Sequence, residues 1–95
     1  MTVLSFERYP VDPKQTERFE TLVNELLAIM RTAPGALWAD AGRAFDDEPS
    51  YLLLSEWRTD ADLDAWLASD TPRGFGDAVD AALRGDITRR RFATG

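Results

Sequence analysis

The sequence of 95 residues contains no cysteine and no histidine. Without cysteine, the chain can form no disulfide, no thiolate metal site and no cysteine nucleophile. Without histidine, it lacks the usual proton-transfer group at neutral pH and the commonest metal ligand. The sequence also has no apolar run near the roughly 20 residues that a membrane span needs, and no phosphate loop or dinucleotide fingerprint. These absences exclude most thiol-, imidazole- and nucleotide-dependent chemistry.

Positive charge is scarce as well. The chain has 11 lysines and arginines against 17 aspartates and glutamates, which gives a net charge of −6. An acidic chain is repelled by phosphate backbones and anionic lipids, so we expect neither nucleic acid nor a membrane as a partner. The first residues lack the basic segment and cleavage site of a secretion signal, which predicts a cytoplasmic protein. The length predicts one domain over residues 1–95.

The hydrophobic pattern predicts the order strand, helix, strand, strand, helix, strand. Runs of β-branched, aromatic and aliphatic residues predict strands over residues 3–9, 36–45, 51–57 and 87–92. A helix is expected from Pro13 to the Pro34-Gly35 pair, with Asp12 as its cap and Gln15 completing a capping box. A second helical region begins at Thr59 or Asp60, is interrupted before Pro72 and ends at Gly85. Residues 46–50 are predicted to form an acidic turn.

This order consists of two β-α-β halves. It predicts an α+β protein with the ferredoxin-like βαββαβ sandwich and an antiparallel sheet. The two helices cover only one face of such a sheet. On the other face, however, the third strand carries the apolar Leu52 and Leu54, and the first strand carries Leu4 and Phe6. We therefore expect a second copy to cover this face in a homodimer, the alternative being that strand ends or the acidic turn fold over it.

Three consecutive features carry a family resemblance. They are the first helix ending in Pro34-Gly35, the strand Tyr51-Leu52-Leu53-Leu54-Ser55-Glu56-Trp57, and the acidic helix running from Thr59 to Asp70. With them, nearly the whole chain resembles the antibiotic biosynthesis monooxygenase family, whose members form dimeric α+β barrels. The resemblance implies a cofactor-independent monooxygenase, without metal or flavin, that acts on a small hydrophobic aromatic substrate of the polyketide or quinol type.

Two branches of this family are similar to the chain at single residues. In the haem-degrading branch, Trp66 matches the helix tryptophan, but Glu7 stands at the asparagine position and Gly76 at that of the histidine ligand. We therefore expect no haem, and no other cofactor. In the quinol-oxygenase branch, Trp57 matches the strand tryptophan, with Leu53 at the asparagine position and Leu63 near the tyrosine.

The alternation of side chains along strands predicts a candidate site. It places Ser5, Glu7 and Tyr9 on one face of the first strand and the odd-numbered residues from Tyr51 to Trp57 on one face of the third. If the helices cover this face, their aromatic side chains close a small apolar pocket over it. The candidate substrate-binding residues are Ser5, Tyr51, Leu53, Ser55, Leu63, Trp66 and Phe75, and the candidate catalytic residues are Glu7 and Trp57. The alternative is that these aromatic residues only fill the core.

Glu7 is the main candidate for chemistry. Burial would disfavour the charged form of its carboxyl group and suit it to take a proton from a phenolic or enolic substrate, whose carbanion would react with oxygen. Alternatively, Glu7 forms a structural ion pair with Arg89 or Arg91 across the sheet. A second class of function also stays open, namely a non-catalytic small-ligand-binding or dimerisation module of the same fold.

Two runs of like charge, one of arginines and one of aspartates, are predicted to have structural roles. Alternation separates Arg90 from its two arginine neighbours, so this run is expected to make edge or interface ion pairs rather than one anion site. Asp60, Asp62 and Asp64 are scattered around the start of a helix, where their negative charge interacts favourably with the helix dipole. Their spacing makes a metal site the weaker interpretation.

Overall fold

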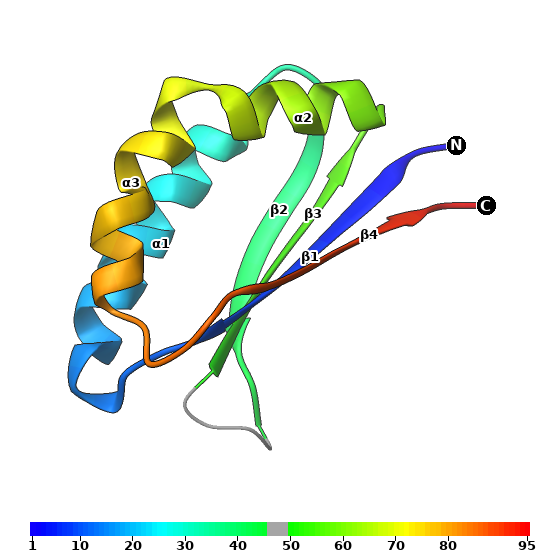
Figure 1. The fold of residues 1–95 in the computed structure, drawn as a ribbon. Coiled ribbons are helices and arrows are strands. Elements are labelled where there is room, and N and C mark those ends of the chain that lie inside the picture. The colour runs from blue at the N-terminus through cyan, green and yellow to red at the C-terminus, as the bar shows by residue number, and fades with distance from the viewer. Residues whose placement is uncertain (46–49) are drawn as a thin grey trace.

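The computed structural model describes residues 1–45 and 50–95 of the chain. Within these residues the elements are β1 (Val3–Pro10), the 3-10 helix η1 (Pro13–Gln15), α1 (Thr16–Met30), β2 (Ala36–Arg43), β3 (Ser50–Trp57), α2 (Asp60–Ala68), α3 (Asp70–Ala81) and β4 (Thr88–Ala93). The strands form one antiparallel sheet in the order β2-β3-β1-β4. This confirms the predicted α+β ferredoxin-like fold (Figure 1). The predicted acidic turn lies outside the described residues except for Ser50.

The helix starts differ in detail from the sequence prediction. Asp12 does act as a cap, but its Oδ1 accepts a hydrogen bond from the amide of Lys14 at 3.0 Å, and a 3-10 turn follows. The predicted capping box is therefore wrong, because Gln15 makes no side-chain cap and ends this turn instead. Thr59 caps α2 as expected, through its Oγ1 and the amide of Asp62 at 3.1 Å.

The end of α3 is set by the strand that it lies beside. The predicted helix to Gly85 stops at Ala81, because the backbone beyond it pairs with the segment that follows β1. The amide of Asp12 donates to the carbonyl of Ala82 at 2.9 Å, and Val11 forms an isolated bridge with Leu83. These bonds hold the last turn of α3 against the end of β1.

The helices all lie on one face of the sheet, as Figure 1 shows. Between them and the sheet lies the core, whose buried apolar side chains are Tyr9, Val11, Phe19, Val23, Leu26, Leu27, Met30, Ala39, Tyr51, Leu53, Trp57, Leu63, Trp66, Val79 and Ala82. No helix in the described residues has the length and apolar character to cross a membrane.

The helices leave the other face of the sheet uncovered in Figure 1. The register pairs Phe6 with Leu54 and Leu4 with Phe92, so these side chains share that face. Phe92 is 43% exposed, and the three others are half-buried. We refer to this surface as the open face.

Candidate functional site

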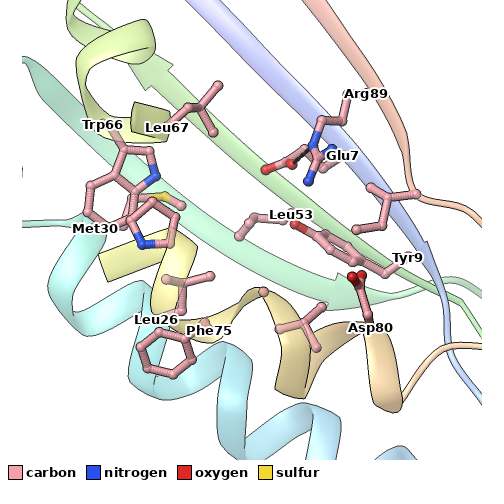
Figure 2. A pocket seen from close by; sticks show the side chains of 14 residues that line it. Glu7, Tyr9, Leu26, Met30, Leu53, Trp66, Leu67, Phe75, Asp80 and Arg89 are labelled. Atoms are coloured by element: carbon pink, nitrogen blue, oxygen red, sulfur yellow. Dashed lines mark hydrogen bonds and ion pairs between the residues drawn. The ribbon is translucent and has the colours of Figure 1, made fainter. Parts of the chain in front are cut away.

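A cavity of about 230 Å³ lies between the sheet and the helices. Its wall combines side chains from β1, β3, α1, α2, α3 and the segment leading into β4: Glu7, Tyr9, Leu26, Met30, Leu53, Trp66, Leu67, Pro72, Phe75, Gly76, Val79, Asp80, Ile87 and Arg89. Most of these side chains are apolar, and Figure 2 shows the charged ones gathered at one end. A space of this size and character suits a small aromatic molecule with a few polar groups.

The polar end of the cavity is built around Glu7. This carboxylate comes from the middle of β1, and its side chain is only 9% exposed. The sheet register places Arg89 of β4 directly beside it, and Arg89 Nε donates to Glu7 Oε2 at 2.7 Å. The pairing across the sheet, which the sequence left as an alternative, is therefore present.

Tyr9 completes this polar end from the same strand. Burial raises the pKa of the Tyr9 hydroxyl far above its ordinary value, and the charge of Glu7 acts in the same direction, as does the hydrogen bond between the two side chains. Tyr9 therefore keeps its proton at neutral pH and can donate it in a hydrogen bond, while its oxygen can still accept one. Its ring packs against Phe19, with the ring centroids 5.5 Å apart.

The predicted site residues divide into two groups. Glu7, Leu53, Trp66 and Phe75 all line the cavity. The others stand elsewhere, and these are Ser5, Tyr51, Ser55, Trp57 and Leu63. Ser5 and Ser55 are buried opposite each other in the sheet, and Leu63 is buried in the core.

Trp57 lies behind the cavity wall rather than in it. The side chain is fully buried, and its Nε1 donates to Ser55 Oγ at 2.9 Å. Its ring stacks on Trp66, with 6.2 Å between the ring centroids and 28° between the planes. Trp57 therefore supports the ring that faces the cavity.

Tyr51 does not line this cavity and instead belongs to a cluster with Glu20 of α1 and Arg43 of β2. Its hydroxyl donates to Glu20, and Arg43 Nη2 donates to the same carboxylate at 2.9 Å. Burial raises the pKa of Tyr51, and the hydrogen bond to Glu20 raises it further. These residues border a separate depression of about 240 Å³.

Three polar cavity residues were absent from the predicted site, namely Tyr9, Asp80 and Arg89. Tyr9 could have been found, because it continues the alternation of Ser5 and Glu7. Arg89 was named only as an ion-pair partner, since its place at the cavity depends on the pairing of the two ends of the chain. For Asp80 the sequence carries no signal beyond its position one residue after the buried Val79.

The charged runs have structural roles. Arg91 binds Asp60 through Nη1 and Asp64 through Nη2, both at 2.8 Å, which ties β4 to the start of α2. Arg89 and Arg91 of the arginine run therefore make ion pairs within the protomer. In the described part of the chain, no group of three or more acidic, histidine or cysteine side chains could hold a metal ion.

The profile of the antibiotic biosynthesis monooxygenase family matches residues 2–80. This chain belongs to that family. A comparison with curated proteins found no match. The matched segment contains Glu7, Tyr9 and Asp80 but ends before Arg89.

Solved structures share the fold of this family member over its whole length. A conserved protein from Methanosarcina mazei superposes with a TM-score of 0.94 at 15% identity, covering 100% of this chain and 94% of the other. Rv0793 from Mycobacterium tuberculosis gives 0.91 at 17% identity, with 99% and 95% covered. A variant of SnoaB, a cofactor-independent oxygenase from Streptomyces nogalater, gives 0.85 at 20% identity, with 98% and 92% covered. At these identities the likeness concerns the fold.

Proposed function

We propose that this chain is a cofactor-independent monooxygenase that acts on a small hydrophobic aromatic substrate of the polyketide or quinol type. The observation that carries the proposal is a buried carboxylate, Glu7, at the polar end of an otherwise apolar cavity. The family membership supports it, as does the similar fold of SnoaB, which is a cofactor-independent oxygenase.

The proposed chemistry begins with proton transfer. A substrate whose reacting carbon lies between aromatic rings and a carbonyl or phenol loses a proton to Glu7, and the resulting carbanion passes electrons to dioxygen. In the net reaction, a CH₂ group and O₂ give a C=O group and water, so dioxygen is the only oxidant required. The positive charge of Arg89 stabilises the substrate anion as it forms, and the apolar walls exclude water from it.

In this proposal the tryptophans have different roles. Trp66 contacts the substrate, because it lines the cavity. Trp57 acts as a positioning residue, because it holds the Trp66 ring from behind. Leu53 and Phe75 contribute apolar contacts on either side of the substrate.

We also propose that the working unit is a homodimer formed through the open face. A face that displays Leu4, Phe6 and Leu54 side by side would be exposed to water in a single copy. At one end of it, Glu56 already accepts a hydrogen bond from Trp38 Nε1 at 2.7 Å and another from Thr2 Oγ1. Its charge is thus satisfied within one protomer and does not prevent burial by a second copy.

One observation favours the non-catalytic alternative. Arg89 Nε already donates to Glu7 Oε2 at 2.7 Å, so this buried carboxylate is held by the protein and is less free to reach a substrate proton. A module with this arrangement would bind an aromatic ligand in the cavity and leave it unchanged.

Oxygen uptake separates the two functions. Anthrone and its hydroxylated derivatives are the probes, and the wild-type protein is expected to consume oxygen and release the quinone. Replacing Glu7→Gln is expected to lower the rate 10²- to 10⁴-fold, as is typical for loss of a general base. Asp77→Asn, an exposed carboxylate on α3 outside the cavity wall, is the matched control and should not change the rate. Ligand binding without oxygen uptake by the wild type would identify a binding module instead.

A further inference from the structure

Two opposite charges face the cavity without binding each other. Arg89 uses Nε for Glu7 at 2.7 Å, and its side chain stays 59% exposed, so the five N–H donors of the guanidinium are not all occupied by Glu7. The side-chain carboxylate of Asp80 on α3 has no hydrogen-bond or ion-pair partner among the described residues, although Asp80 lines the cavity. Figure 2 shows the guanidinium entering from β4 and the carboxylate rising toward it from α3, with the Tyr9 ring nearby.

The two charges are near enough to influence each other. Partial burial lowers the pKa of Arg89, but the hydrogen bond to Glu7 and the negative charges of Glu7 and Asp80 raise it above the ordinary value. Asp80 and Arg89 therefore interact electrostatically, and both line the cavity. The backbone bonds that fix the end of α3 and the β1/β4 pairing hold the two groups in place from opposite sides.

The same two residues stand where the cavity opens outward. A second depression of about 510 Å³ adjoins it, and Asp80, Ile87 and Arg89 line both spaces. A ligand whose rings fill the apolar part must therefore present its polar edge to this pair.

The hydrogen-bonding groups of Arg89 and Asp80 determine which ligand edge they can bind. A guanidinium only donates hydrogen bonds and a carboxylate only accepts them, so the pair is complementary to an acceptor and a donor on the same ligand edge. Two carboxylates surround the one guanidinium, which disfavours a ligand with a further negative charge. We propose that Asp80 and Arg89 select neutral aromatic ligands that carry a hydroxyl group and a carbonyl group along one edge, the hydroxyl donating to Asp80 and the carbonyl accepting from Arg89.

This proposal rests on the cavity being the ligand site of the proposed function, but it concerns selection and not oxygen chemistry. The probes are four bicyclic compounds of nearly equal size: 7-hydroxy-1-tetralone has both groups, 1-tetralone has only the carbonyl, 5,6,7,8-tetrahydro-2-naphthol has only the hydroxyl, and tetralin has neither. Binding is measured without oxygen by quenching of tryptophan fluorescence, since Trp66 lines the cavity.

The wild type should bind the hydroxytetralone about tenfold more tightly than 1-tetralone, the usual effect of one hydrogen bond to a charged group. In Asp80→Ala, this preference for the hydroxyl should disappear while the preference for the carbonyl remains. In Arg89→Gln, the carbonyl preference should fall and the hydroxyl preference remain. Asp77→Ala, on the same helix and outside the cavity wall, should keep both preferences.

The Asp80 comparison keeps the test informative if Arg89→Gln unfolds, because Asp80 is exposed and its carboxylate has no partner to lose in residues 1–45 and 50–95. A hydroxyl preference that survives in Asp80→Ala, or its absence in the wild type, would overturn the proposal. Selective binding without oxygen uptake would leave this inference standing and remove only the oxygenase activity. Oxygen uptake without selective binding would support the oxygenase activity and overturn the selection by Asp80 and Arg89.

Discussion

Trp57 of β3 and Trp66 of α2 stack with their ring centroids 6.2 Å apart, and only Trp66 reaches the cavity. Trp57 is fully buried and Trp66 is 7% exposed, so both rings contribute apolar burial to the protomer. The pair connects the sheet to the helix layer at the apolar end of the cavity. Stability depends on both rings, whereas contact with a ligand depends on the outer one alone.

Matched replacements of the two rings should separate these roles. Trp57→Phe and Trp66→Phe each remove part of a buried ring, and both should lower the free energy of unfolding by about 1–3 kcal/mol, less than the 3–5 kcal/mol typical of replacement by alanine. Only Trp66→Phe should change the affinity for 1-tetralone, since that ring forms part of the cavity wall. Urea denaturation and binding titrations measure the two effects. An equal loss of affinity in both variants would contradict the assignment of Trp57 as a support.

Alkaline pH should destabilise the protein through Tyr9. Because burial raises the pKa of this hydroxyl in the folded state, the folded protein keeps a proton that the unfolded chain loses near pH 10. This stabilisation is complete below pH 10 and decreases as the pH rises, by up to about 1.4 kcal/mol per pH unit. Tyr51, whose pKa burial also raises, contributes in the same direction.

Urea denaturation from pH 8 to pH 11 measures this loss. Tyr9→Phe has no proton to retain, so its stability should fall less steeply above pH 10 than that of the wild type. Tyr51→Phe is the matched control and should remove only the smaller contribution of the second tyrosine. An unchanged slope in Tyr9→Phe would show that the buried hydroxyl does not control the alkaline transition.

The turn after α1 depends on Gly35. Its φ of +84° lies in the left-handed region, and a Cβ there would come within 2.5 Å of three atoms of the Asp62 side chain, its Cβ included. Gly35→Ala should therefore cost at least 1–2 kcal/mol, roughly the cost of the backbone conformation alone, with the overlap added to it. Gly74, inside α3 with open space around it, is the control, and Gly74→Ala should stabilise the protein by about 0.5–1 kcal/mol. Thermal or urea unfolding of both variants gives the comparison.

The sequence predicted the fold because its signals are local. The stripe of α1, the Thr59 cap and the Pro34-Gly35 stop each depend on a few neighbouring residues, and together they determine the element order. Four of the 14 residues that line the cavity were also candidate site residues, and two of them, Glu7 and Leu53, follow from the alternation that places them on the covered face.

The rest of the site could not be predicted, because it depends on how far each element is shifted along its neighbours. Alternation gives the face of Tyr51 but not its position along β3, which brings it to Glu20 instead of the cavity. Arg89 reaches Glu7 through a register between residues 82 positions apart, which no local pattern encodes. Asp80 faces the cavity because backbone bonds beyond Ala81 fix the rotation of α3.

The open face gives the last prediction. If a second copy covers it, a charge placed at its centre must lose water on association, so Leu54→Asp should convert the dimer to protomers. Leu54 is only half-buried within one copy, and the variant should therefore stay folded, which circular dichroism checks. Ala28→Asp, on the exposed side of α1, is the control and should leave the mass at twice that of the protomer in sedimentation equilibrium. A wild-type protein that sediments as a single protomer would contradict the dimer, and a Leu54→Asp dimer would place the interface on another surface.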